Sequence, residues 1–195
     1  MAKIILITHQ KGGVGKSTLA FNLAVNIRES AKVCLVDLDE QGSLLNIKKA
    51  SEVPIYEASK LKELLKSDYD FIFIDTPPYL TNQLKELCDL ANVIIIPTKA
   101  GILDLFAIKS TIEIVEESNN GNKALIVFNM VKPNTTLTDE IKSHLGDYDI
   151  KISKNMISDL VAFSRSILVN GVEENNKAQK QIDNLTKEVL TLSIN

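Results

Sequence analysis

Glycines, lysines and hydroxyl side chains lie close together near the start of the chain, in the run Gln-Lys-Gly-Gly-Val-Gly-Lys-Ser-Thr at positions 10–18. The glycines leave consecutive backbone N–H groups free to turn inward and cradle phosphate oxygens. Lys16 is placed to reach the β- and γ-phosphates of a nucleotide, and the Ser17 hydroxyl is placed to hold Mg²⁺. A helix starting near Lys16 would add its positive dipole end to the same anion site. The spacing therefore predicts a nucleotide phosphate loop.

Three carboxylates follow apolar runs that we expect to be strands. Asp37 and Asp39 end one run and are two residues apart, so both can face the nucleotide along an extended chain. Asp75 ends the run Phe-Ile-Phe-Ile-Asp and could grip a hydrated Mg²⁺ through water, since this ion keeps several of its waters. Ligands of open α/β sheets bind at the carboxyl ends of the strands. We therefore expect these carboxylates to lie near the phosphates.

Short β-rich runs alternate with helical stretches, which is typical of an α/β fold. The runs are apolar without alternation, as in strands that are covered on both faces. We expect a mostly parallel, twisted β-sheet with helices on both faces, of the phosphate-loop NTPase type, forming one domain over residues 1–195. The expected strands are Lys3–Thr8, Lys32–Asp37, Asp70–Asp75, Asn92–Pro97 and Lys123–Asn129, with extra edge strands at Val53–Tyr56 and Tyr148–Ile152.

Helices are expected in the segments between the strands. An apolar stripe on the penultimate helix (Ile157, Leu160, Val161, Ser164, Ile167 and Leu168) is interpreted as core, and so is the face of the last helix with Ile182, Leu185, Val189 and Leu192. The expected helices are Lys16–Ser30, Leu44–Ala50, Lys60–Ser67, Thr81–Ala91, Leu103–Glu117, Leu137–Leu145, Asn155–Val169 and Asn176–Leu192.

Composition excludes several classes of protein. A hydrophobic content of 45% and a charged content of 24% are ordinary for a soluble globular protein, and a net charge of −3 is not that of a strongly basic nucleic-acid binder. Cys34 and Cys88 form no CxxC spacing, so we expect no disulfide, zinc or iron–sulfur site. No apolar run approaches the ~20 residues of a membrane span, and we expect a cytoplasmic protein.

The phosphate loop departs from the generic pattern, because Gln10 replaces the first glycine and Lys11 directly precedes the paired glycines. In this respect KGGVGKST resembles the deviant phosphate loop of the ParA/MinD class of ATPases. VDLDEQG resembles the second motif of that family, DFIFIDTPP its Walker B motif, and Ile-Ile-Pro-Thr at 95–98 its strand end near the nucleotide. Glu40 stands where the family usually has proline, so the exit from the second motif would be less rigid. Over nearly its whole length the chain looks like a short ParA-type DNA partition ATPase.

This resemblance implies ATP and Mg²⁺ as cofactors and a role for each matching residue. Lys11 would reach across a dimer interface to the partner's phosphates, Asp39 would orient the attacking water, and Asp37 would support Mg²⁺ and Lys16. Thr18 would contact the α-phosphate and Asn129 would sit near the adenine. The expected catalytic residues are Lys11, Lys16 and Asp39; the nucleotide-binding residues are Lys11, Gly12, Gly13, Val14, Gly15, Lys16, Ser17, Thr18 and Asn129; the metal-binding residues are Ser17, Asp37 and Asp75.

The same resemblance implies an ATP-dependent homodimer that binds DNA and is released when a ParB-like centromere-binding partner stimulates hydrolysis. The first expected strand begins at Lys3, which leaves no room for the helix-turn-helix region of the larger family members. We therefore expect non-specific binding through phosphates, in association with the nucleoid. The candidate DNA contacts are Lys151, Lys154 and Arg165.

Three alternatives remain open. A MinD-like regulator would cycle on a membrane through an amphipathic C-terminal helix, but the tail here lacks Trp and Phe and acidic residues interrupt its basic ones. An electron-transfer or metal-cluster ATPase would need cysteines in another arrangement. A metabolic ligase or kinase would use the same phosphate loop with a small-molecule acceptor, for which no acceptor site stands out.

Overall fold

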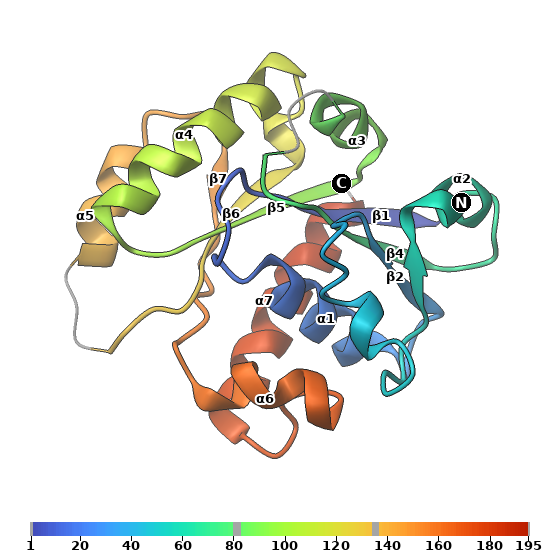
Figure 1. Cartoon of the computed structure of the whole chain (residues 1–195). Helices are drawn as coiled ribbons and strands as arrows, with labels where there is room; N and C mark the ends of the chain where they lie inside the picture. The colour runs from blue at the N-terminus through green and yellow to red at the C-terminus, as the bar shows by residue number, and fades with distance from the viewer. Residues whose placement is uncertain (1, 80–82, 134–136, 195) are drawn as a thin grey trace.

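A seven-stranded sheet forms the central layer of the computed structural model, which describes residues 2–79, 83–133 and 137–194 (Figure 1). Every neighbouring pair of strands is parallel, so the predicted α/β fold is confirmed. Both extra edge strands are present, one at each edge of the sheet. From edge to edge, the strands are β3 (Ile55–Glu57), β2 (Val33–Asp37), β4 (Phe71–Asp75), β1 (Lys3–Ile7), β5 (Val93–Thr98), β6 (Ala124–Phe128) and β7 (Lys151–Ile152).

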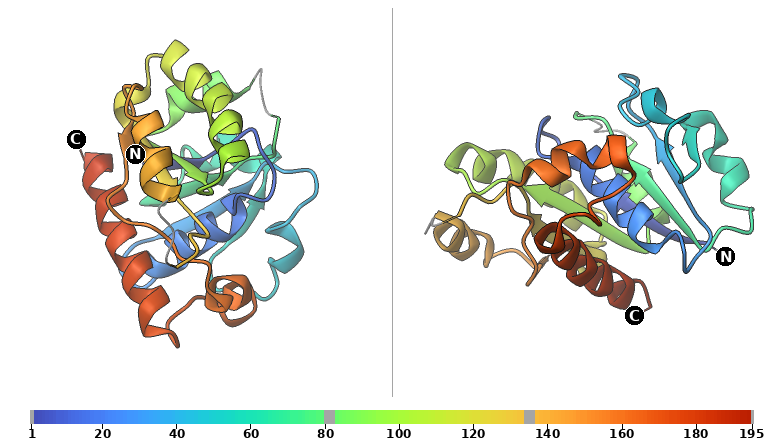
Figure 2. Two further views of the ribbon diagram at one scale, coloured as in Figure 1. Left: turned by 90° about the vertical axis from the view of Figure 1, so that its left-hand side faces the viewer. Right: turned by 90° about the horizontal axis from the view of Figure 1, so that it is seen from below.

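Helices cover both faces of the sheet (Figure 2). One face carries α1 (Lys16–Ile27), α6 (Val161–Val169) and α7 (Asn176–Ile194). The other carries α2 (Leu61–Leu64), α3 (Leu84–Leu90), α4 (Ile102–Glu117) and α5 (Leu137–Leu145). Short 3-10 turns lie at Leu45–Ile47, Ala58–Lys60 and Gly121–Lys123.

Alternate residues of each strand enter two different cores. In β1, Ile5 and Ile7 pack with α1 and α7, whereas Ile4 and Leu6 pack with the helices of the opposite face. Because both faces are buried, both sets of side chains are apolar, which explains the continuous apolar runs in the sequence. β1 lies between β4 and β5, so the loop that follows it emerges at the middle of the carboxyl edge of the sheet.

Two predicted helices on the β2–β4 side of the sheet are much shorter than expected. In place of Leu44–Ala50 only the 3-10 turn at Leu45–Ile47 forms, because the Asp37 carboxylate accepts the N–H groups of Leu44 and Leu45 and ties the chain to the end of β2. In place of Lys60–Ser67, α2 covers only Leu61–Leu64. The helix predicted at Thr81–Ala91 is α3, and residues 81–82 lie outside the described part of the chain.

The prediction of one helix over Asn155–Val169 is wrong for residues 155–160. The Ile157 N–H donates to the Phe128 carbonyl and the Val131 N–H donates to the Ile157 carbonyl, both at 2.9 Å, so this segment pairs with the chain beyond β6 and α6 begins only at Val161. The predicted core stripe is also wrong in part, since the Val161 and Leu168 side chains are 64% and 78% exposed. Phe163 and Ser166 face the core instead, because the delayed start of the helix changes which face packs.

The last helix docks against the sheet as predicted. Ile182, Leu185 and Val189 of α7 are buried in the core that α1 and the sheet form, and Figure 2 shows α7 lying across that face. Within the described residues, none of the helices combines the length and the apolar character that crossing a membrane requires. Because Ile182, Leu185 and Val189 are buried, the apolar face of α7 packs against the protein's own core.

Replacing Leu185 with alanine should lower the free energy of unfolding by about 2–5 kcal/mol, because the side chain is fully buried and a cavity would remain. Leu168→Ala makes the same chemical change on an exposed helix face and should alter stability by less than about 0.5 kcal/mol. Urea unfolding followed by circular dichroism measures both. Equal effects would contradict the docking of α7.

Candidate nucleotide-binding site

The loop between β1 and α1 has a backbone that only glycine adopts freely at two positions. Gly13 and Gly15 have φ angles of +72° and +88°. A Cβ atom on Gly15 would lie 2.3 Å from Nδ2 of Asn129, so no side chain fits there. The amide of Asn129 in turn donates to the Val14 carbonyl at 2.8 Å. The predicted nucleotide residue Asn129 thus supports the loop from the end of β6, 115 residues away in sequence.

Lys16 and Asp75 place a basic and an acidic group inside the protein near this loop. Lys16 begins α1 and is buried, and its Nζ donates to the Lys11 carbonyl at 3.2 Å. Burial lowers the pKa of Lys16, while the charges of Asp75 and Asp39 oppose that shift. The parallel register sets Asp75 beside Ile7 of β1 and beside Asp37 of β2. Strand pairing therefore brings the predicted carboxylates to the phosphate loop.

Asp75 fits a site for a hydrated cation. Its carboxyl group is completely buried, and neither oxygen has a hydrogen-bond partner among the described residues. Burial raises the pKa of Asp75 to about 7, although the neighbouring Ser17 hydroxyl opposes the rise. In the described part of the chain, no three His, Cys, Asp or Glu side chains converge as a direct metal cage requires. One or two protein oxygens, completed by waters and phosphates, are what Mg²⁺ prefers.

Asp37 and Asp39 organise the turn that follows β2. Asp37 accepts backbone N–H groups with both oxygens, from Asp39 at 3.0 Å and from Leu44 at 2.9 Å. Asp39 accepts the Gln41 N–H at 2.9 Å and is partly exposed at the edge of the site. Asp37 therefore has a structural role that the sequence did not indicate, and its support of Mg²⁺ stays a prediction. The role of Asp39 toward water also stays a prediction.

A small cleft opens beside Asn129 on the α1 side of the loop. Thr18 lines it from α1, Met130 follows β6, and Ser158 and Asp159 approach from the segment that replaces the start of the predicted helix. The extended course of residues 155–160 is thus what forms one wall of the cleft. This position is consistent with the predicted places of Thr18 and Asn129 along a bound nucleotide.

Sequence reasoning missed three residues that hold the start of the loop. His9 is buried and its Nδ1 accepts the Lys11 N–H at 2.8 Å. Asp104 accepts from the Lys11 ammonium at 2.7 Å, and Thr111 accepts the Gln10 N–H at 3.0 Å. Asp104 lies in the first turn of α4 and, unlike Asp37 and Asp75, does not end a strand, so no such local signal identified it.

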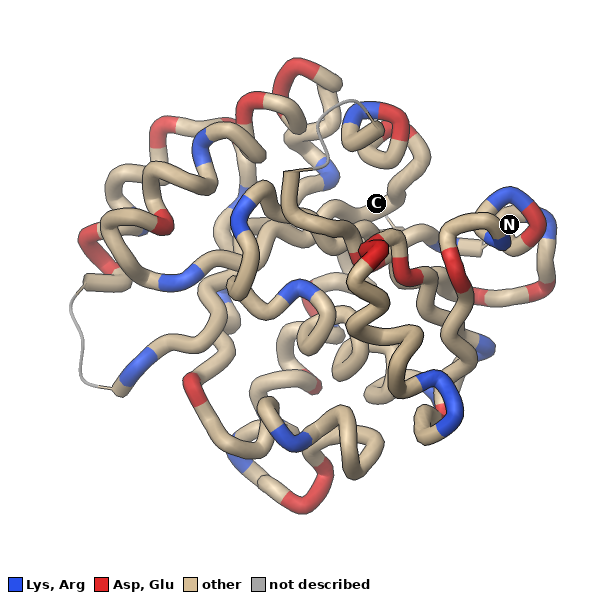
Figure 3. Tube along the Cα trace, in the orientation of Figure 1, with Lys and Arg blue, Asp and Glu red and all other residues tan. Residues whose placement is uncertain are grey.

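The predicted DNA contacts do not form one patch. Lys151 and Lys154 line a groove of about 410 Å³ between the β7 edge and α7, and Lys187 of α7 joins them there. Arg165 lines a separate cleft between α6 and the segment at 171–175. Lysines and acidic residues are otherwise interspersed along the trace (Figure 3). The groove therefore contains a local basic cluster on a chain of net negative charge.

A glycine-rich loop at the carboxyl edge of a parallel sheet, with a buried lysine and a buried carboxylate beside it, defines a phosphate-loop nucleotide-binding protein. The chain belongs to the CobQ/CobB/MinD/ParA nucleotide binding domain family, whose model matches residues 5–191. The family resemblance expected from the motifs is thereby confirmed.

The chain is similar to proteins that carry different names. The chain is 27% identical to the maintenance of carboxysome distribution protein A of Halothiobacillus neapolitanus, over 95% of each chain. It is 26% identical to the septum site-determining protein MinD of Helicobacter pylori, over 73% of this chain and 72% of that protein. A plasmid partition protein of Borrelia burgdorferi has the same fold, with a TM-score of 0.68, 22% identity and coverage of 97% and 98%.

Two buried groups of the site should make opposite contributions to the pH dependence of stability. Burial, helped by the charge of Lys16, lowers the pKa of His9 from 6.5 to about 4. Between these pH values the unfolded chain binds more protons than the folded chain, so the contribution of His9 to the free energy of unfolding rises with pH. Burial raises the pKa of Asp75 from 3.8 to about 7. Between these pH values the folded chain binds more protons than the unfolded chain, so the contribution of Asp75 to the free energy of unfolding falls as pH rises. In the parent protein the two oppose each other.

Asp75→Asn should leave the His9 contribution unopposed. Between about pH 4.5 and 6.5, the free energy of unfolding of the variant should rise relative to the parent by about 1 kcal/mol per pH unit. Urea unfolding of nucleotide-free protein in the presence of a chelator measures this difference. Parallel pH profiles for the two proteins would contradict the burial of an unpartnered carboxyl group at Asp75.

Proposed function

We propose that the chain is a Mg²⁺-dependent ATPase that hydrolyses ATP to ADP and phosphate. The observation that carries the proposal is the buried Lys16 beside an unpartnered, buried Asp75 under the glycine loop. The backbone of residues 12–18 would hold the phosphates, and Lys16 would contact the β- and γ-phosphates. Ser17 and Asp75 would hold Mg²⁺, Asp75 through water, and the ion would supply charge that neutralises the phosphates during transfer.

The base and sugar end of the nucleotide would extend toward the cleft beside Asn129. Thr18 lies one helical position beyond Ser17 and lines this cleft, which supports its assignment to the α-phosphate. Asn129 holds the loop through the Val14 carbonyl and borders the same cleft, which supports a place for the adenine there.

We further infer that ATP makes the chain a homodimer. Lys11 directly precedes the glycines of the loop and its side chain is partly exposed, which supports contact with the phosphates of a second copy. Charge from Lys11 would add to that of Lys16, and Asp39 at the exposed edge of the site would orient the attacking water. Because ATP would bind best to the dimer, dimerisation would become a nucleotide-dependent switch.

Asp39→Ala should retain ATP binding but lose hydrolysis, which would trap the dimer. Lys11→Ala should bind ATP as a monomer, whereas Lys16→Ala, the control, should not bind nucleotide because no other side chain replaces its charge at the phosphates. Size-exclusion chromatography with light scattering, in ATP and Mg²⁺, measures the dimer, and phosphate release measures hydrolysis. A purely monomeric Asp39→Ala protein would refute the role of Asp39, and an undisturbed Lys11→Ala dimer would refute action across the interface.

We propose DNA segregation as the cellular role, with a ParB-like centromere-binding partner that stimulates hydrolysis and releases the protein from DNA. The groove with Lys151, Lys154 and Lys187 supports binding to phosphates. Glu188 also lines this groove. Its carboxylate accepts hydrogen bonds from the Ser153 hydroxyl at 2.6 Å and from the Asn155 side-chain amide at 2.7 Å, which are neutral donors and not groove lysines. The lysines of the groove are exposed and have no ion pair among the described residues. Arg165 would be a second, separate contact.

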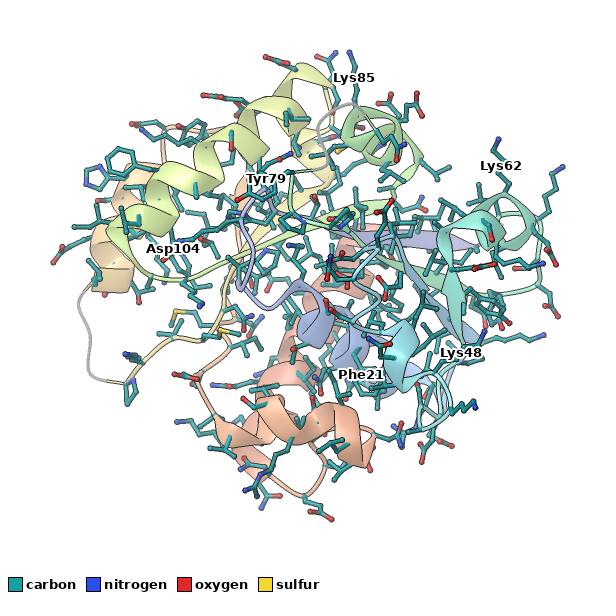
Figure 4. All side chains as sticks on the ribbon, in the orientation of Figure 1. Phe21, Lys48, Lys62, Tyr79, Lys85 and Asp104 are labelled. Carbon is teal, nitrogen blue, oxygen red and sulfur yellow. The ribbon has the colours of Figure 1, made fainter. Side chains whose placement is uncertain are left out.

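DNA binding should require ATP, be insensitive to sequence and fall steeply with salt. If each subunit of a dimer neutralises about three phosphates, the log–log slope of affinity against salt should be about −5. Lys187→Glu should weaken binding to all sequences alike. Lys62→Glu makes the same charge change on α2 (labelled in Figure 4), which packs on the opposite face of the sheet from α7, and should have little effect. Fluorescence anisotropy of a random duplex across a salt series measures both. Equal binding with ATP, with ADP and without nucleotide would refute the switch.

A MinD-like membrane regulator is the second candidate, favoured by the similarity to the Helicobacter pylori protein. Membrane attachment through the tail would require α7 to leave the core, since Ile182, Leu185 and Val189 are buried there. This observation favours DNA as the surface on which the protein assembles. Co-sedimentation with anionic liposomes in ATP, without co-sedimentation with DNA, would reverse that choice.

A further inference from the structure

Lys11 and Asp104 form an ion pair in the nucleotide-free protein. The Lys11 Nζ lies 2.7 Å from Oδ1 of Asp104, which belongs to the first turn of α4. The Asp104 side chain is only 11% exposed, whereas that of Lys11 is 38% exposed. Figure 4 labels Asp104 at the start of α4. The ammonium group of Lys11 is thus paired with a carboxylate that is largely buried.

The surroundings of the pair are built to hold it. A Cβ atom on Gly101 would lie 2.6 Å from Oδ2 of Asp104, so the glycine leaves the space that the carboxylate occupies. Two helical turns further along α4, the buried Thr111 accepts the Gln10 N–H. The two contacts lie seven residues apart on one face of the helix, with the fully buried Ile108 between them. α4 therefore accepts hydrogen bonds from the start of the phosphate loop at two positions, Asp104 and Thr111.

We propose that Asp104 is a positioning residue that holds Lys11 within its own subunit, and that this pair must open before Lys11 can contact phosphates bound to a second copy. The inference rests on the proposed action of Lys11 across a dimer. A carboxylate and a phosphate offer the same charge-assisted hydrogen bond to one ammonium group, so they compete for it. Asp104 thereby sets the protein concentration at which ATP produces a dimer.

Opening the pair would leave the Asp104 carboxylate enclosed and without its counter-charge, which is unfavourable. Ile102, Leu103 and Phe106, which are close to Asp104 in sequence on α4, are exposed. Burial of these apolar side chains against the second copy would offset the loss. The nucleotide-free protein keeps the pair and stays monomeric, because nothing then replaces the carboxylate.

The test compares Asp104→Asn with Glu113→Gln, which removes one negative charge from the exposed face of the same helix. With the non-hydrolysable analogue AMPPNP and Mg²⁺, Asp104→Asn should strengthen dimerisation by about tenfold for each subunit, hence by about a hundredfold in the dimer dissociation constant. Glu113→Gln and the conservative Asp104→Glu should behave like the parent. In a Lys11→Ala background, Asp104→Asn should have no effect on dimerisation, because the competing group is gone.

A second measurement reports the pair itself. In nucleotide-free protein, an amine-reactive ester should label Lys11 several-fold faster in Asp104→Asn than in the parent, with Lys62 as the internal reference, as read by mass spectrometry. Unchanged labelling of Lys11 would overturn the proposal. So would unchanged or weaker dimerisation of Asp104→Asn while Lys11→Ala weakens the dimer as expected. If Lys11→Ala itself dimerises like the parent, the proposed function of Lys11 fails first, and the inference fails with it.

Discussion

Burial of a lysine and a carboxyl group under the glycine loop is the constraint on which the rest of the structure depends. Lys16 reaches only a backbone carbonyl, and Asp75 has no hydrogen-bond partner among the described residues. Buried ionisable groups are unfavourable without close partners, so this arrangement is incomplete in the free protein. Phosphate oxygens and a hydrated divalent ion supply what each group lacks. A ligand that does so stabilises the folded protein, which couples the loop and its neighbours to nucleotide binding.

The all-parallel sheet makes this arrangement attainable. All its carboxyl ends meet at one edge, so β1, β2, β4 and β6 each bring a functional segment there. Asp37 binds the turn after β2 to the sheet, and Asn129 supports Gly15 from the end of β6. α4 adds Asp104 and Thr111 from the opposite side of the loop. Two distant parts of the chain, the end of β6 and α4, therefore hydrogen-bond to residues of the phosphate loop.

Several exposed features lie away from the phosphate loop. The chain is similar both to a protein named for carboxysome distribution and to one named for septum placement, so this similarity does not by itself specify a cargo. The exposed features of this chain include the lysine groove at the β7 edge, the exposed apolar residues of α4, and Val161 and Leu168 of α6. A net charge of −3 is compatible with phosphate binding because the basic groups of the groove are clustered.

The phosphate loop, the carboxylates after β2 and β4, and the α/β fold followed from the sequence by itself, because glycine spacing and apolar strand runs are local signals. The face of α7 that packs on the core was also predicted from the helical spacing of its apolar residues. Only the tertiary structure decided that Asp37 holds a turn, that Asp104 holds Lys11, and that Arg165 lies apart from Lys151 and Lys154. It also decided that residues 155–160 are extended, because Phe128 and Val131 satisfy the hydrogen bonds of Ile157. Partners this distant in sequence leave no periodic signal, so only the packed chain reveals them.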